Sequence, residues 1–334
     1  MKSAISSAMK HKELTMIQVF LRWLKNILGA GKNKNEGSEY GRRTGMEPLV
    51  TKRLDMRTRS LKPAPTVRLR PDDLMEEHPA ANSPASGIAK TPSLLRLEWF
   101  GLSDTGVVRD HNEDSFFCAG KEDTGLFVVA DGMGGHDAGE VASRIAVETV
   151  CSSVRQAAEK DDDPVELIRW SVLRANEAVV REGTKNGSNM GTTLGVALVA
   201  ENTAYIASVG DSRVYWIDNG SISQITEDHS LVAKLVAAGK LTREEARNHP
   251  KSNLLYRTIG SEENVKVDTF TIGLKKNGCL LLCTDGLWGE VTDVDIHQAC
   301  ATEKDIRAAC ARLISTANEN GGKDNITAVM VRVL

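Results

Sequence analysis

The stretch "LFVVADGMGGHDAG", residues 126–139, places a carboxylate at the end of an apolar run. Leu126 to Ala130 are apolar, Asp131 follows directly, and three glycines lie within the next four residues. The apolar run is typical of a buried strand. The glycines leave the backbone beside Asp131 almost free of side chains. A helical pattern then begins at about Gly139, so the stretch predicts a strand, a Gly-rich turn and a helix, with an acid held at the end of the strand.

Short apolar runs separated by turns continue on both sides of this stretch. Asn219-Gly220 lies between two of them and predicts a hairpin. Residues 230–258 have little β character and predict a mostly helical insert. Because hairpins alternate with pairs of helices, we expect an α+β fold of antiparallel sheets flanked by helices, not a parallel doubly wound fold. The predicted strands are 97–103, 115–119, 125–131, 193–200, 203–210, 212–218, 221–226, 265–272, 277–286 and 326–333, and the predicted helices are about 139–159, 164–182, 292–300 and 303–319.

Charge divides the chain of 334 residues into a basic N-terminal region and an acidic remainder. Residues 1–95 hold 17 Lys and Arg against 9 Asp and Glu, a net charge of +8, and the remaining 25 against 36 give −11. The acidic part argues against nucleic acid as a ligand and is compatible with bound cations. We therefore expect three segments: a basic amphipathic region at 1–28, a flexible basic linker rich in Gly, Pro, Ser and Thr at 29–95, and an acidic folded domain at 96–334, whose motifs are considered below.

Residues 13–28 show apolar side chains at helical spacing, interrupted by basic ones. This pattern predicts a helix that lies on a membrane surface or docks on a partner protein. The alternatives are a helix that packs on its own domain and a tail that is only partly ordered. No apolar run approaches the roughly 18 residues of a membrane span, and no secretory cleavage site follows the helix. The six cysteines form no Cys-x-x-Cys pair and predict buried thiols rather than a zinc site. The expected location is cytoplasmic, with membrane association through the tail as an alternative.

Acidic residues recur at the ends of predicted strands, usually beside glycine. Each one alone is ordinary turn chemistry, but five such elements in one domain predict a shared site. Clustered carboxylates repel unless a cation lies between them, and an all-oxygen set suits Mg²⁺ or Mn²⁺. The Gly132 carbonyl could add a backbone ligand, whereas a phosphate-binding glycine loop fits "DGMGG" less well. The acids are Asp131, Asp285, Asp324, Asp211 and the pair Glu113 and Asp114.

Two such ions roughly 3.5–4 Å apart could share a water molecule, lower its pKa and direct it onto phosphorus. A cationic side chain must also hold the phosphate. Arg109 lies just before Glu113 and offers a fork of donors for two phosphate oxygens. These residues together predict a hydrolase of phosphate esters.

Seven stretches in this order resemble the metal-dependent Ser/Thr phosphatases of the protein phosphatase 2C family in their bacterial form. The resemblance covers about residues 97–334 and leaves the first 95 residues outside. It implies an α-β-β-α sandwich of two antiparallel sheets with helices on both outer faces and a metal cleft at one end. The stretches are "SDTGVVRDHNEDSF", "VVADGMGGHDAGEVAS", "MGTTLGVALV", "SVGDSRVYWI", "ITEDHSLV", "LLLCTDGLWG" and "GGKDNITAVMV".

The resemblance also assigns roles to individual residues. It implies that Asp131 bridges two Mn²⁺ or Mg²⁺ ions and that Asp285 and Asp324 complete the first. The second ion would take the Gly132 carbonyl, with Glu113 and Asp114 supporting its waters. Further implied roles are phosphate binding for Arg109, a third and weaker ion for Asp211 with Asp285, and a mobile flap for residues 228–258.

One position departs from the family pattern. Animal members have a histidine directly after the Asp-Gly, taken as the acid that protonates the leaving group, and here that position is Met133. His136 is near in sequence but is not assigned this role. His111 and His229 are interpreted as structural histidines. The general acid is therefore not identified from the sequence.

The function expected from this reasoning is hydrolysis of phosphoserine and phosphothreonine in proteins by a water bridging two metal ions. Partners would be phosphorylated proteins in a bacterial Ser/Thr kinase pathway, with a role as a regulator of a secretion system also considered. The alternatives are a catalytically silent relative that binds phosphoproteins and a hydrolase of another phosphoester on the same fold.

Overall fold

The computed structural model describes residues 95–135, 137–157, 163–200, 202–218 and 220–334. All of them lie in one compact unit. The helix predicted at 13–28 and the linker up to residue 94 lie outside the described residues, as does His136. No helix in the described part of the chain is long and apolar enough to cross a membrane.

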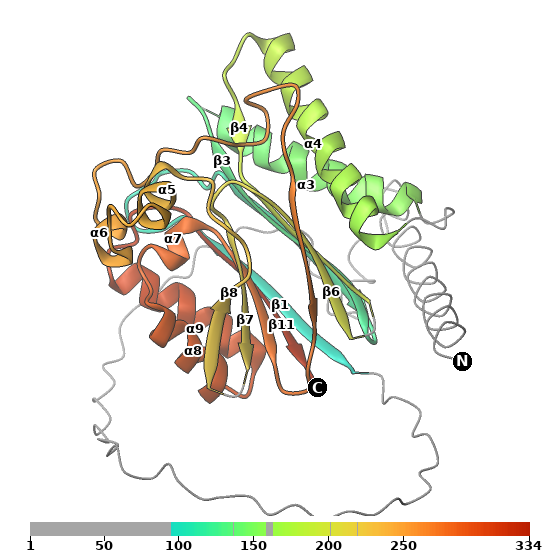
Figure 1. Cartoon of the computed structure of the whole chain (residues 1–334), viewed down its shortest axis with the longest axis vertical. Coiled ribbons are helices and arrows are strands. Elements are labelled where there is room, and N and C mark those ends of the chain that lie inside the picture. The colour runs from blue at the N-terminus through green and yellow to red at the C-terminus, as the bar shows by residue number, and fades with distance from the viewer. Residues whose placement is uncertain (1–94, 136, 158–162, 201, 219) are drawn as a thin grey trace, which may run out of the picture. The chain divides into compact units, whose positions relative to one another are not determined.

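Two antiparallel sheets form the centre of the unit (Figure 1). The first sheet has the order β1-β11-β10-β7-β8 and the second β2-β3-β5-β6-β9, with β4 paired to β3. The strands of the first sheet are Leu97–Asp104 (β1), Ile326–Val333 (β11), Cys279–Cys283 (β10), Arg213–Asp218 (β7) and Ser221–Gln224 (β8). Those of the second are Asp114–Lys121 (β2), Thr124–Met133 (β3), Leu194–Ala200 (β5), Thr203–Val209 (β6), Asp268–Gly273 (β9) and Gly191–Thr192 (β4).

Helices cover the outer face of each sheet, as Figure 1 shows. Ala138–Gln156 (α3) and Pro164–Asn186 (α4) pack on the second sheet, and Asp293–Thr302 (α8) and Ile306–Glu319 (α9) pack on the first. A third apolar cluster fills the space between the sheets. The predicted α-β-β-α sandwich is therefore confirmed.

Strand β3 shows why its sequence is continuously apolar. Leu126 and Val128 pack in the cluster beneath α3 and α4, whereas Phe127 and Val129 pack between the two sheets. Successive side chains of a strand point to opposite faces, so a strand covered on both faces needs apolar residues at every position. The run that precedes Asp131 is thus a buried central strand, which anchors the acid rigidly.

Most predicted elements are confirmed, with three differences. Strand β10 ends at Cys283, and Asp285–Trp288 form the one-turn helix α7, so Asp285 begins a helix and does not end a strand. Strand β4 was not predicted. The insert at 230–258 contains only the short helices Leu231–Ala237 (α5) and Arg243–Arg247 (α6), and its remainder is mostly turns because Gly239 has a positive φ and proline follows at 250. The predicted hairpin is present as the β7–β8 pair.

Candidate active site

Strands β2 and β3 place two of the predicted acids opposite each other. Asp114 and Asp131 are direct partners in the antiparallel register, so their side chains share one face of the sheet. The backbone of Asp131 is held by the chain that enters β5: its N–H donates to Thr193 Oγ1 at 2.9 Å, and its carbonyl oxygen accepts from Thr192 Oγ1 at 2.8 Å. The acid therefore sits on backbone that is bonded on both sides.

Gly132 stands where no other residue fits. A Cβ at this position would overlap the carbonyl oxygen of Gly139 and crowd that of Glu113. The Gly132 N–H donates to the Glu113 carbonyl oxygen at 3.1 Å, and Ser143 of α3 donates to the same oxygen at 2.6 Å. The glycine thus lets the first turn of α3 close onto the Glu113 backbone beside Asp131.

The first sheet supplies Asp285 and Asp324 from neighbouring strands. Asp285 follows β10 and Asp324 precedes β11, and β10 and β11 are paired. Asp114 reaches across from the second sheet: its Oδ2 accepts from Thr284 Oγ1 at 2.8 Å and from Thr327 Oγ1 at 2.6 Å. Asp114 thereby ties the two sheets together at the edge where the acids gather. The Thr284 hydroxyl donates to Asp114, and the Thr284 side chain makes no capping hydrogen bond to α7.

The pKa values of these acids show that they form one electrostatic group. Burial, followed by the charges of Asp285, Asp114, Asp211 and Asp324, raises the pKa of Asp131 well above its ordinary value. Burial and the neighbouring Asp324 raise the pKa of Asp285 to about 6. The pKa values of Asp114 and Asp211 are also raised, in both cases chiefly by burial. A cation placed among these groups would reverse the cost of ionising them.

The donor set fits a hard divalent cation. Asp114 Oδ1 and Asp285 Oδ1 are buried and have no hydrogen-bond partner among the described residues. A buried oxygen without a partner is costly unless a ligand supplies one. Within the described ranges, however, no three Asp, Glu, His or Cys side chains are gathered closely enough to hold an ion as they stand. Ion binding would therefore draw the carboxylates together, with all-oxygen ligands of the kind that Mn²⁺ and Mg²⁺ accept.

Arg109 lies at the rim of the site. Its Nη2 donates to Asp324 Oδ2 at 2.8 Å, and both side chains are partly exposed, at 50% and 36%. The loop that carries Arg109 is anchored by Asn325, whose Nδ2 donates to the carbonyl oxygens of Thr105 and His111 at 2.9 Å. Asn325 Oδ1 also accepts from the Glu113 N–H at 2.7 Å. Asn325 was missed by the sequence reasoning, although its place between Asp324 and β11 was the available signal.

Asp211 is supported by a network of half-buried side chains. Trp288 of α7 donates to the Asp211 carbonyl oxygen at 3.0 Å, and the Arg213 guanidinium lies 3.5 Å from the Trp288 ring centroid. Arg213 in turn forms an ion pair with Asp228 at 2.7 Å. None of these three supporting residues was singled out from the sequence.

His229 connects residues 256 and 257 to the turn before Asp211. Its Nδ1 accepts from the Gly210 N–H at 2.9 Å, so Nε2 carries the proton and donates to Asp268 Oδ2 at 3.0 Å. Arg257 Nη1 also lies 2.8 Å from Nε2, but a protonated Nε2 cannot accept a hydrogen bond from it. Arg257 therefore forms its ion pair with Asp268, at 3.1 Å. Burial lowers the pKa of His229. The structural interpretation is confirmed for His229, whereas His111 is exposed and does not fit it.

The structure therefore brings the predicted acids to one edge of the sandwich, with Arg109 at its rim and Met133 as the last residue of β3. An acidic site of oxygen donors at the edge of two antiparallel sheets, with an arginine at its rim, is suited to metal-dependent hydrolysis of phosphate esters. The family described as "Protein phosphatase 2C" matches residues 107–331, and the chain belongs to this family. The predicted family and enzyme class, a metal-dependent protein serine/threonine phosphatase, are thus confirmed.

Bacterial relatives agree with this assignment. The serine/threonine phosphatase stp of Listeria welshimeri is 38% identical over 234 residues, which are 69% of this chain and 93% of that protein. The crystal structure of the catalytic domain of PstP with two manganese ions is 33% identical, has a TM-score of 0.64 and covers 72% of this chain and 99% of that one. PppA, "a key regulatory component of T6SS in Pseudomonas aeruginosa", is 30% identical with a TM-score of 0.62 over 72% and 99% of the two chains.

Proposed function

We propose that this protein hydrolyses phosphoserine and phosphothreonine in phosphoproteins, with the acids at the sheet edge holding two Mn²⁺ or Mg²⁺ ions. The raised pKa values of Asp131 and Asp285, to which the neighbouring charge of Asp324 contributes, carry the proposal, because partly buried like charges gathered at one edge are stabilised in their ionised form by a cation. When bound, such ions lower the pKa of a water molecule and neutralise charge on the phosphoryl oxygens. The PstP structure with two manganese ions supports the number of ions.

We propose the residue roles that the resemblance to the protein phosphatase 2C family implies. Asp131, on the bonded end of β3, is proposed to contact both ions, and Asp285 and Asp324 to complete the first. Beside Asp131, the Gly132 carbonyl is proposed as a ligand of the second ion, whose waters would be oriented by the acids at positions 113 and 114. Asp211, supported by Trp288, is proposed to hold a third ion together with Asp285.

Arg109 is proposed to orient the phosphate. A guanidinium has five N–H donors in a planar fork, so Arg109 can keep its bond to Asp324 and still offer two donors to phosphate oxygens. Met133 supplies no proton, so no side chain on β3 after Asp131 acts as the general acid. The leaving alkoxide would then take its proton from water.

The test is hydrolysis of a phosphothreonine peptide with Mn²⁺ and with EDTA, in the wild type, Asp131→Ala and Asp285→Ala. Glu148→Gln on the outer face of α3 is the control, because its side chain is 59% exposed. Activity that requires both the metal and the two acids supports the proposal. A folded, Mn²⁺-loaded wild type that binds the peptide without cleaving it would indicate a phosphoprotein-binding relative, and cleavage of a phosphodiester instead would indicate another esterase.

For the cellular setting, we propose that the enzyme counteracts a bacterial Ser/Thr kinase. The description of PppA as a regulator supports a secretion assembly as one candidate partner. We also propose a cytoplasmic location, with residues 13–28 as a contact to a membrane or a partner. Residues 228–258 are proposed to form a flap that selects substrates. A fluorescent fusion of residues 1–95 that stays diffuse in cells would exclude recruitment by the tail.

A further inference from the structure

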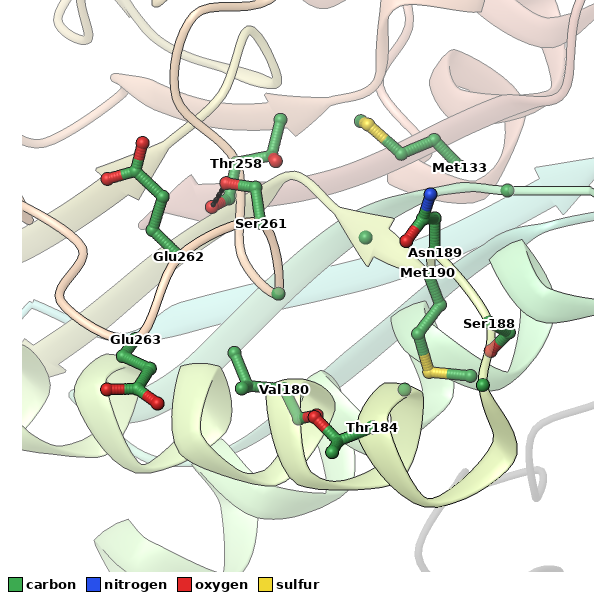
Figure 2. A pocket seen from close by; sticks show the side chains of 15 residues that line it. Met133, Val180, Thr184, Ser188, Asn189, Met190, Thr258, Ser261, Glu262 and Glu263 are labelled. Atoms are coloured by element: carbon green, nitrogen blue, oxygen red, sulfur yellow. Dashed lines mark hydrogen bonds between the residues drawn. The ribbon is translucent and has the colours of Figure 1, made fainter.

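A groove of about 760 Å³ begins where β3 ends (Figure 2). Met133, two residues after Asp131, lines one end of it, and Glu262 and Glu263 line the other. The last turns of α4 and the chain from Gly187 to Gly191 form the sides that lie between these ends. Figure 2 shows Met133 and Asn189 on one side of the groove and the two glutamates on the opposite side. One end of the groove therefore lies two residues from Asp131 along β3.

The floor of the groove is bonded directly to the strand that carries Asp131. Met133 pairs with Gly191 in the β3–β4 register. Thr192 in turn exchanges two backbone hydrogen bonds with Ile259, at 3.0 and 2.8 Å. The chain at 258–263 is thus an extension of the same hydrogen-bonded surface, and a ligand lying on it would be aligned with the catalytic site.

The two glutamates are carried on fixed backbone. Asn176 of α4 is 1% exposed, and its Nδ2 donates to the carbonyl oxygens of Glu262 at 2.8 Å and Glu263 at 3.1 Å. Its Oδ1 accepts from the Gly260 N–H at 2.8 Å. A buried side chain that makes three such bonds holds the loop in place, so the acids are presented to the groove without a cost of ordering the loop.

The charge of the groove selects its ligand. The carboxylates of Glu262 and Glu263 are exposed, and neither has an ion-pair partner among the described residues. The groove is lined by no Lys or Arg, so it is not a second phosphate site. The hollow next to it, about 620 Å³, shares Val180, Thr184 and Glu263 with the groove. It is also lined by Glu177, Arg181 and Lys185, so the basic side chains nearest to Glu263 lie outside the groove.

We propose that this groove binds the peptide segment on one side of the phosphorylated residue and selects substrates that carry Lys or Arg there. This inference rests on the proposed function, because it takes the phosphate to lie at the carboxylate site. The apolar lining of Met133, Val180 and Met190 accepts the aliphatic part of a long basic side chain, and the glutamates accept its charge. Glu262 and Glu263 are specificity residues and take no part in the reaction itself.

The test compares three phosphothreonine peptides of equal length with the full chain: one with neutral flanks, one with two arginines before the phosphothreonine and one with two after it. The Glu262→Gln, Glu263→Gln double variant is compared with the wild type. Exposed charge pairs give small effects, so kcat/KM for one arginine peptide should fall by between about twofold and twenty-fivefold, chiefly through KM. The neutral peptide and p-nitrophenyl phosphate should be cleaved unchanged.

A matched control removes the same charge elsewhere. Glu148→Gln with Glu166→Gln neutralises two exposed acids, 59% and 67% exposed, on the outer helices. If this control lowers the preference as much as the groove variant does, or if both arginine peptides respond equally, the general negative field of the domain is responsible and the groove proposal is overturned. Cleavage of every peptide without any charge preference also overturns it. A wild type that cleaves neither peptides nor p-nitrophenyl phosphate refutes the proposed function instead.

Discussion

Asp285→Asn should stabilise the metal-free protein while it impairs catalysis. Burial and Asp324 raise the pKa of Asp285 from an ordinary value of 3.8 to about 6. The folded protein therefore binds the proton more tightly than the unfolded chain does. This contribution to stability is fully present below pH 4 and is lost as the pH rises through 6. At neutral pH the folded state carries the whole cost of the buried charge.

The size of the effect follows from the shift. At 1.36 kcal/mol for each pKa unit, a change from 3.8 to about 6 corresponds to roughly 3 kcal/mol. Asparagine has nearly the same shape and no charge, so the metal-free variant should be more stable than the wild type by about that amount at neutral pH. For a domain of this size the gain is about 6–12 °C in Tm.

Mn²⁺ should remove or reverse the stability difference between Asp285→Asn and the wild type. An ion at a hundredfold excess over its Kd stabilises the fold by about 2.7 kcal/mol, and the variant lacks one of the proposed ligands. The assay is thermal unfolding with EDTA and with Mn²⁺ at pH values of about 4 and 7.5, with Glu148→Gln as a control that should change little. A variant no more stable than the wild type in EDTA at neutral pH, or one whose advantage persists at pH 4, would refute the reasoning.

Three further substitutions probe the site and its supports. Arg109→Lys keeps the charge but loses the fork, so kcat/KM for a phosphothreonine peptide should fall about tenfold or more; wild-type activity would remove Arg109 from phosphate binding. His229→Ala leaves the buried Gly210 N–H without its acceptor and should lower the free energy of unfolding in urea by about 2–4 kcal/mol; a change below about 0.5 kcal/mol would contradict the network. Asn176→Ala should lower the free energy of unfolding by about 1–3 kcal/mol without changing hydrolysis of p-nitrophenyl phosphate. If the folded variant also loses that activity, the 260–263 loop supports catalysis directly.

Local patterns in the sequence were enough to predict most of the strands, the longer helices and the acids at the strand ends. Strand β3 reads as an apolar run because both its faces are buried, and Gly132 follows Asp131 because the backbone there meets Gly139. Such signals need only neighbouring residues, since periodicity and turn chemistry act over a few positions. A set of carboxylate ligands for Mg²⁺ or Mn²⁺ could be inferred in the same way, from acids that recur beside glycine at strand ends.

Contacts between distant segments could be found only in the tertiary structure. Asp114 bonds to Thr284 and Thr327, which lie 170 and 213 residues further along the chain, and Asn325 holds the loop of Arg109 across a similar separation. No short window contains both partners, and the partners meet only because β10 and β11 pair and the two sheets stack. The groove at Met133 depends in the same way on α4 and residues 258–263, because a concave surface is a property of packed elements and not of any one segment.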